Sequence, residues 1–194
     1  MERYAELHRE TKETEVSVAL SLEGGEVKIS TGVGFFDHML TALAVHSGFG
    51  LTVKTVGDWA VDCHHTIEDT GIVLGQAFAK ALGTKQGIRR YGSAFIPMDE
   101  ALGFAAVDVS SRPFLVFHGE FPQERVGDFD TCMTEEFFRA FAVNAGLTLH
   151  LDCKYGKNSH HMIEALFKAA AHALKDAVSL SEDESAVLSS KGTL

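Results

Sequence analysis

The sequence has 194 residues, a hydrophobic fraction of 45% and a formal net charge of −10. This length allows one domain or two small halves packed together, and the acidic excess disfavours nucleic acid as a partner because phosphate backbones attract basic surfaces. Its apolar runs are far shorter than the roughly 18 residues of a membrane span, and the charged start differs from a signal peptide, so we expect a cytoplasmic protein that does not enter a membrane.

The three cysteines, Cys63, Cys132 and Cys153, are odd in number and show no paired spacing. This usage argues against a disulfide scaffold and is compatible with reduced thiols. Cys63 directly precedes a pair of histidines, and because thiolates bind metals it is a candidate ligand. Because the chain has no C-x-x-C motif, we interpret Cys63 as a buried or bystander thiol.

The first part of the chain alternates strand and helix signals. Residues 15–22 place apolar side chains at every second position, which predicts a half-buried strand, and a Gly-Gly turn leads to a return strand at 27–31. A helix is predicted from about Asp37, a possible N-cap, to Gly48. A strand at 51–56 and a second helix follow, the latter running to Leu82 and stopped by Gly83.

The second part repeats this order. Strands are predicted at 101–109 and 114–121 around a turn at 110–113, then a helix at 135–145, a strand at 147–151 and a helix at 160–178. We therefore predict an α+β fold made of an internally duplicated unit, in which each half has a small β-sheet packed by two α-helices. The expected division is 1–86 for the first half, 87–180 for the second, and 181–194 for a C-terminal tail that closes over substrate.

Direct comparison supports the duplication. The segment 42–48 matches 140–146 at an offset of 98 residues, whereas His64-His65-x-x-Glu68 returns as His160-His161-x-x-Glu164 at an offset of 96. A period of nearly 100 residues is too long for a solenoid. We therefore expect two similar subdomains of one chain that share an interface. If packing alone were preserved, the apolar face would match best, yet the histidines and the glutamate match most closely.

Each His-His-x-x-Glu cassette is interpreted as a set of metal ligands. On a helix the first His and the Glu, four residues apart, face the same way, whereas adjacent His side chains project about 100° apart and suit two different metals. At the 98-residue offset His38 corresponds to Glu136, which gives each half one further ligand. Eight such donors around two metals leave open coordination positions, and imidazole with carboxylate suits manganese, iron or zinc.

Six motifs, in this order, closely resemble the imidazoleglycerol-phosphate dehydratase family over essentially the whole chain. They are Thr11-Lys12-Glu13-Thr14, Gly34-Phe35-Phe36-Asp37-His38-Met39-Leu40, His64-His65-Thr66-Ile67-Glu68-Asp69, Pro97-Met98-Asp99-Glu100-Ala101, Asn158-Ser159-His160-His161-Met162-Ile163-Glu164-Ala165 and Ser189-Ser190-Lys191-Gly192. The resemblance implies a manganese-dependent hydro-lyase of histidine biosynthesis that converts D-erythro-imidazole-glycerol phosphate to imidazole-acetol phosphate. It also implies two Mn²⁺ per subunit and a homo-oligomer of 24 subunits with active sites between neighbours.

The family pattern assigns roles to individual residues. It implies metal ligation by His38, His64, His65, Glu68, His160, His161 and Glu164; at position 136 some members have His, and Glu136 is kept as a ligand. Catalysis is expected of Glu13. Substrate contacts are expected from Glu13, His38, His64, His65, Glu68, Arg90, Arg112 and the tail residues Ser189, Ser190 and Lys191. His46 is expected either to line the pocket or to cap its helix.

These assignments suggest a mechanism. We hypothesise that the metals hold the substrate ring as imidazolate, that loss of a hydroxyl gives a conjugated diazafulvene, and that a carboxylate handles protons, with Glu13 the candidate. For the metals we hypothesise that His38, His65 and Glu68 share one ion with His160 or His161, the mirror set holding the second. Two other functions remain open from the residues alone: a dinuclear metal hydrolase, and a storage or structural assembly in which the ions only join subunits.

Overall fold

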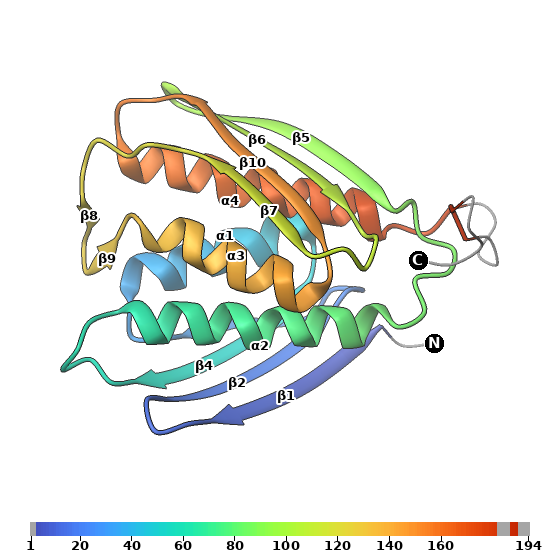
Figure 1. Ribbon diagram of the computed structural model, residues 1–194, viewed down its shortest axis with the longest axis horizontal. Coiled ribbons are helices and arrows are strands. Elements are labelled where there is room, and N and C mark those ends of the chain that lie inside the picture. The colour runs from blue at the N-terminus through green and yellow to red at the C-terminus, as the bar shows by residue number, and fades with distance from the viewer. Residues whose placement is uncertain (1–2, 182–186, 190–194) are drawn as a thin grey trace.

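The computed structural model describes residues 3–181 and 187–189, and it contains two four-stranded sheets with the helices between them (Figure 1). The first half comprises β1 (Tyr4–Glu10), β2 (Thr14–Ser21), β3 (Val27–Ser30), α1 (Gly34–Ser47), β4 (Gly50–Gly57) and α2 (His64–Leu82). The second half comprises β5 (Tyr91–Met98), β6 (Ala101–Asp108), β7 (Phe114–His118), β8 (Arg125–Val126), β9 (Phe129–Asp130), α3 (Met133–Ala145), β10 (Thr148–Tyr155) and α4 (Ser159–Val178).

The two large sheets share one topology, which confirms the predicted duplication. Their strand orders are β1-β2-β4-β3 and β5-β6-β10-β7. In each sheet the first three strands pair antiparallel, and the last pair, β3 with β4 or β7 with β10, is parallel. The α+β prediction is therefore confirmed, with the short β8–β9 hairpin as an addition of the second half.

Some predicted boundaries were wrong. Strands β1 and β5 were not predicted. β1 is mostly polar, and β5 contains Gly92, Ser93 and Pro97, which an edge strand tolerates but which weaken its sequence signal. β7 ends at His118, before the predicted Phe121. Helix α1 begins at Gly34 instead of Asp37, and Asp37 is not its N-cap: its Oδ1 atom accepts hydrogen bonds from the amide and hydroxyl of Thr31.

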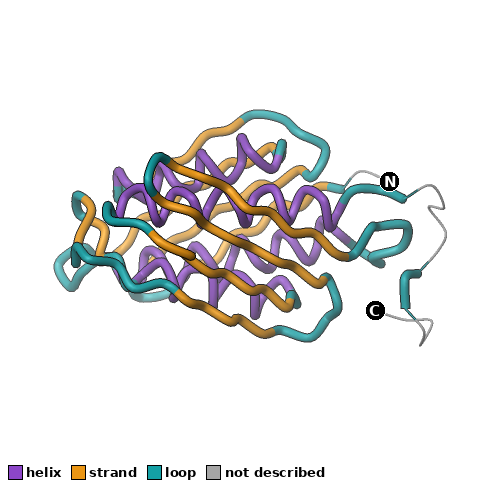
Figure 2. Tube along the Cα trace, turned by 90° about the horizontal axis from the view of Figure 1, so that it is seen from above, coloured by secondary structure: helices purple, strands orange, loops and turns teal. Residues whose placement is uncertain are grey.

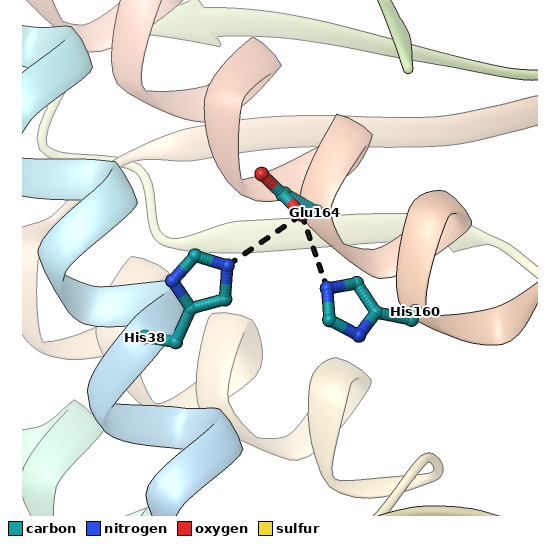
Figure 3. A group of neighbouring side chains, drawn as sticks. All are labelled: His38, His160 and Glu164. Atoms are coloured by element: carbon teal, nitrogen blue, oxygen red, sulfur yellow. Dashed lines mark ion pairs between the residues drawn. The ribbon is translucent and has the colours of Figure 1, made fainter. Parts of the chain in front are cut away.

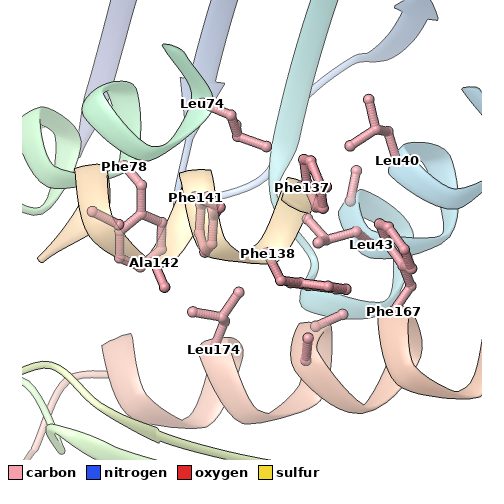
Figure 4. Packing of buried hydrophobic residues seen from close by; sticks show 14 of the residues in the cluster. Leu40, Leu43, Leu74, Phe78, Phe137, Phe138, Phe141, Ala142, Phe167 and Leu174 are labelled. Atoms are coloured by element: carbon pink, nitrogen blue, oxygen red, sulfur yellow. The ribbon is translucent and has the colours of Figure 1, made fainter. Parts of the chain in front are cut away.

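The helices pair across the two halves. α2 lies on β1 and β2 but packs against α3, while α4 lies on β5 and β6 and packs against α1. Seen from above, strands run across the helical layer (Figure 2). The core between the sheets is rich in phenylalanine, and Phe137 of α3 stacks on Phe167 of α4 at a centroid distance of 5.3 Å (Figure 4). One continuous core thus joins the two halves, and the packing of α1 on α4 places α1 beside the second cassette.

Among the described residues, no helix combines the length and apolar character needed to cross a membrane.

Candidate metal centre

The second cassette forms a compact cluster with a residue of the first half. His38 of α1 and the α4 residues His160 and Glu164 offer ligand atoms that all lie within 4.8 Å of one another (Figure 3). The Oε2 atom of Glu164 lies 3.2 Å from Nε2 of His160 and 3.6 Å from Nε2 of His38. The i, i+4 spacing aligns the two α4 side chains, and the α1–α4 contact supplies the third.

Glu164 is the buried member of this cluster, with a side chain only 8% exposed. Its Oε1 atom also accepts a hydrogen bond at 2.7 Å from Lys168. Burial alone would raise the pKa of Glu164, but the hydrogen bond from Lys168 and the nearby charges of Lys168, His38 and His160 bring the pKa below its ordinary value. A buried carboxylate kept ionised between two imidazoles has the donor chemistry of a site for a divalent cation.

The first cassette forms the mirror of this arrangement in looser form. Nε2 of His64 lies 3.5 Å from Oε2 of Glu68, again at i, i+4 spacing. Glu136 of α3 lines an open cavity together with His64, although its carboxylate also lies 3.8 Å from Nε of Arg139. In the described part of the chain, only the cluster around Glu164 brings three donors within 4.8 Å.

Within one chain, this geometry differs from the hypothesised pairing of ligands. His38 lies with His160 and with Glu164, the glutamate of the other cassette, and not with His65 and Glu68. The reason is tertiary: α1 packs on α4 of the second half and not on α2 of its own. Equivalence of the halves then places Glu136, on α3, beside the cassette of α2. Which ligands share an ion stays a prediction.

The second histidine of each cassette has a different partner from the first. The ring centroids of His64 and His65 lie 6.1 Å apart, and those of His160 and His161 lie 5.9 Å apart. Nδ1 of His65 lies 3.0 Å from Asp58, and Nδ1 of His161 lies 2.7 Å from Glu100.

These carboxylates orient the second histidines and change their titration. The hydrogen bond to Asp58 raises the pKa of His65, and the bond to Glu100 raises that of His161. Glu100 in turn has its pKa lowered to about 2, first by His161 and then by the amides of Lys157 and Asn158. A carboxylate on Nδ1 fixes the ring and leaves Nε2 available as a ligand, an arrangement common around protein-bound metals. The sequence analysis gave neither carboxylate a role: Asp58 lies outside the six motifs, and Glu100 was named only as part of one of them.

Glu13 lies beside the first cassette, as required of a residue that would act there. It belongs to the turn between β1 and β2, its carboxylate is 55% exposed, and its Oε1 atom lies 4.0 Å from Nε2 of His65. The structure thus brings Glu13 to the free side of an imidazole whose other nitrogen is already occupied by Asp58.

A row of polar side chains on α4 extends the centre toward the end of α1. His160, Glu164, Lys168 and His172 recur every four residues, and the ring of His172 lies 5.4 Å from that of His46. Burial, with the charges of Lys168 and His172, lowers the pKa of His46. Lys168 and His172 were not predicted, although their four-residue spacing from Glu164 is visible in the sequence.

The predicted substrate arginines lie at the other end of the molecule. Arg90 binds both carboxylate oxygens of Asp108, at 2.7 and 3.2 Å, and Arg112 contacts the same carboxylate at 3.1 Å. The amide of Arg90 bonds to the carbonyl of Ala177, which is thirteen residues beyond Glu164 on α4 and therefore about 20 Å away along the helix. One chain does not bring these arginines to the metal ligands.

The C-terminal tail begins beside these arginines. Arg90 Nη1 donates a hydrogen bond of 2.6 Å to the carbonyl of Leu188, next to Ser189. Ser190 and Lys191 lie outside the described residues. The predicted roles of these three tail residues stay predictions.

Comparison with known proteins places the whole chain in one group. A family model described as imidazoleglycerol-phosphate dehydratase matches residues 31–174. The enzyme of that name from Symbiobacterium thermophilum is 57% identical over 194 residues, covering 100% of this chain and 93% of the relative, and that from Exiguobacterium sp. is 59% identical over 191 residues, covering 98% and 97%. The crystal structure of the Staphylococcus aureus enzyme superposes with a TM-score of 0.84 at 42% identity, covering 92% of this chain and 99% of the other.

Proposed function

Because the chain belongs to the imidazoleglycerol-phosphate dehydratase family, we propose that it dehydrates D-erythro-imidazole-glycerol phosphate to imidazole-acetol phosphate in a manganese-dependent reaction. Membership makes it a hydro-lyase of histidine biosynthesis. The proposal adds to this membership two Mn²⁺ ions per subunit, the residues that hold them and the course of the reaction.

The observation that carries the metal proposal is the cluster around Glu164. His38, His160 and Glu164 would hold one ion, and His64, Glu68 and Glu136 would contribute to the second. His65 and His161, oriented through Nδ1, would offer their Nε2 atoms to ions or substrate. A divalent cation held by these residues would supply Lewis-acid chemistry that lowers the pKa of the substrate's imidazole ring.

Glu13 is the proposed proton-transfer residue. The reaction removes a hydroxyl from the carbon bonded to the imidazole ring and a proton from the next carbon, and the resulting enol converts to the ketone. Departure of the hydroxyl gives the expected diazafulvene, and a base must then take the carbon-bound proton. Glu13 is suited to this task because its carboxylate is exposed and lies 4.0 Å from His65, whereas Glu164 is already bonded to Lys168.

The position of the arginines supports active sites shared between subunits. Arg90 and Arg112 converge on Asp108 about 20 Å along α4 from Glu164, too far to hold the phosphate of a small substrate whose ring lies at the metal ligands. In the proposed assembly of 24 subunits, a neighbour supplies the arginines and the tail residues Ser189, Ser190 and Lys191. We propose a cytoplasmic location for this assembly, in keeping with the free thiols of the chain.

The experiment that tests the proposal replaces Glu13. Glu13→Gln keeps the shape of the side chain but removes its basicity, so kcat should fall roughly 10²- to 10⁴-fold. Manganese content, measured by inductively coupled plasma mass spectrometry, should remain at two ions per subunit. The control His160→Ala should lose metal as well as turnover. Loss of metal in Glu13→Gln, or undiminished kcat, would refute the assigned role.

A further inference from the structure

A polar network, in which Thr14 and Asp69 are buried and Arg9 is partly exposed, joins helix α2 to the turn that carries Glu13. The hydroxyl of Thr14, the first residue of β2, donates a short hydrogen bond to Oδ2 of Asp69 on α2. Nη1 of Arg9, the penultimate residue of β1, lies 2.6 Å from the same oxygen. Thr14 is 3% exposed and the side chain of Asp69 10% exposed. One carboxylate therefore anchors both strands that flank the turn.

The turn itself is organised from within by Thr11. Its hydroxyl accepts hydrogen bonds from the amides of Glu13 and Thr14, at 3.1 and 3.0 Å, and its amide donates to the carbonyl of Thr14 at 2.9 Å. The turn is thus a compact unit, and its orientation is set by what holds Thr14. Because Asp69 follows Glu68 directly on α2, the same helix that presents the cassette also fixes the turn.

The duplication provides an internal comparison. In the second half the first residue of β6 is Ala101, in the place of Thr14, and the cassette offset of 96 residues puts Ala165 in the place of Asp69. Both alanines are buried, and α4 approaches so closely that a Cβ on Gly103 would lie 2.7 Å from the carbonyl carbon of Ala165. The fold therefore packs this junction with apolar residues alone.

The two turns also differ in what their glutamates do. Glu100, which precedes Ala101 as Glu13 precedes Thr14, bonds through Oε2 to Nδ1 of His161 and through Oε1 to two backbone amides. Glu13 instead faces Nε2 of His65 at 4.0 Å. The polar network thus occurs in the first half, where the side chain of Glu13 makes no such hydrogen bonds to the residues that the structure describes. The position of Glu13 must therefore be set by the backbone of its turn.

We propose that Arg9, Asp69 and Thr14 are positioning residues that hold the Glu13 turn against the first cassette. The Arg9 side chain is 36% exposed, so its ion pair with Asp69 adds little to stability, and the second half packs the same junction with two alanines. The presence of these polar contacts therefore favours a role in specifying geometry. This inference rests on the proposed role of Glu13. The network itself touches neither a metal ligand's donor atom nor the predicted substrate contacts.

The test compares three threonine variants in the metal-loaded protein. Thr14→Val removes the hydroxyl that bonds Asp69, Thr14→Ser retains it, and Thr70→Val is the matched control. Thr70 is the neighbour of Asp69, and its hydroxyl makes a buried hydrogen bond of 2.8 Å to Thr55 of β4 away from the turn. Thr14→Val should lower kcat about tenfold or more with KM changed less than twofold, because displacement of a reacting group is costly. Thr14→Ser and Thr70→Val should keep kcat.

Two further measurements decide whether the effect passes through the turn. Amide hydrogen exchange at residues 11–13 should accelerate in Thr14→Val and not in Thr70→Val. The losses in kcat from Thr14→Val and Glu13→Asp should not add in the double variant, since both displace the same carboxylate.

The outcomes separate this inference from the proposed role of Glu13. Unchanged kcat in Thr14→Val, unchanged exchange in the turn, or fully additive losses would each overturn the positioning role. If Glu13→Gln were fully active while exchange still accelerated in Thr14→Val, the role of Glu13 would fail and the anchoring of the turn would stand.

Discussion

At the scale of single residues, the two histidines of a cassette have different neighbours and hence different uses. His160 shares a carboxylate with His38, whereas His161 is fixed by Glu100 from a turn of the sheet. Partners of this second kind keep a ring in the orientation that a metal requires, and their loss weakens metal binding although no ligand is removed. Glu100 is therefore part of the proposed centre.

Glu100→Gln should weaken manganese binding about 10- to 100-fold. The neutral amide forms a weaker hydrogen bond with Nδ1 of His161, so it orients the ring less firmly and makes its Nε2 atom a weaker donor to a metal. Isothermal titration of the metal-free protein with Mn²⁺ measures this change. Glu26→Gln, an exposed substitution in the loop before β3, serves as the control and should bind as the unsubstituted protein does. Equal affinities of all three proteins would mean that His161 needs no support from Glu100.

At the scale of elements, glycines on α2 let it pack more closely on α3 than the bulkier residues at the equivalent positions of α4 would allow for α1 and α4. A Cβ on Gly75 of α2 would lie 2.6 Å from the carbonyl oxygen of Phe141, and one on Gly71 would lie 2.8 Å from that of Phe137. At the 96-residue offset α4 has Phe167 and Ala171 in these places. Glycines thus allow α2 and α3 to approach backbone to backbone, which also sets the distance between Glu136 and the first cassette.

Gly75→Ala should destabilise the protein by about 1–3 kcal/mol, because the added methyl meets backbone of α3 that cannot move aside cheaply. The gain of up to about 1 kcal/mol in helix propensity offsets only part of this cost. Chemical denaturation followed by circular dichroism measures the difference. Lys80→Ala, an exposed change on the same helix, should stay within about 0.5 kcal/mol. A neutral or stabilising Gly75→Ala would show that the α2–α3 contact is looser than described.

At the scale of the molecule, the predicted catalytic parts lie at two ends of one helix. The predicted metal ligands His160 and Glu164 lie in the first turns of α4, whereas Arg90, Arg112 and the described part of the tail meet beside its last turn. If these residues bind the ring and the phosphate as proposed, one chain cannot place both ends of a small substrate. In the proposed assembly, the arginines of one subunit would lie at the predicted metal ligands of its neighbour.

Mixed assemblies test this arrangement. His160→Ala and Arg90→Ala should each be nearly inactive, yet subunits refolded together in equal amounts should recover about one quarter of full activity, since random mixing leaves that share of sites with both parts intact. A mixture of His160→Ala and Glu164→Ala, two changes on the same α4, should recover nothing. Failure of the first mixture to regain activity, with assembly confirmed by light scattering, would argue against shared sites.

The amino-acid pattern alone predicted the duplication, the sheet-plus-helices unit of each half, and the side chains that share a helix face. Periodicity is local: residues four apart on a helix, such as His160 and Glu164, share a face whatever surrounds them. Strands β1 and β5 were missed because their sequences are weak strand signals: β1 is mostly polar, and Gly92, Ser93 and Pro97 interrupt the apolar pattern of β5.

Only the tertiary structure decided which helices meet. Packing of α1 on α4 gave His38 to the second cassette, and contacts between segments far apart in sequence supplied Asp58, Glu100 and the network around Asp69. The physical reason is that a helix period fixes which residues share a face, while the partner of that face depends on how all the apolar surfaces are buried together.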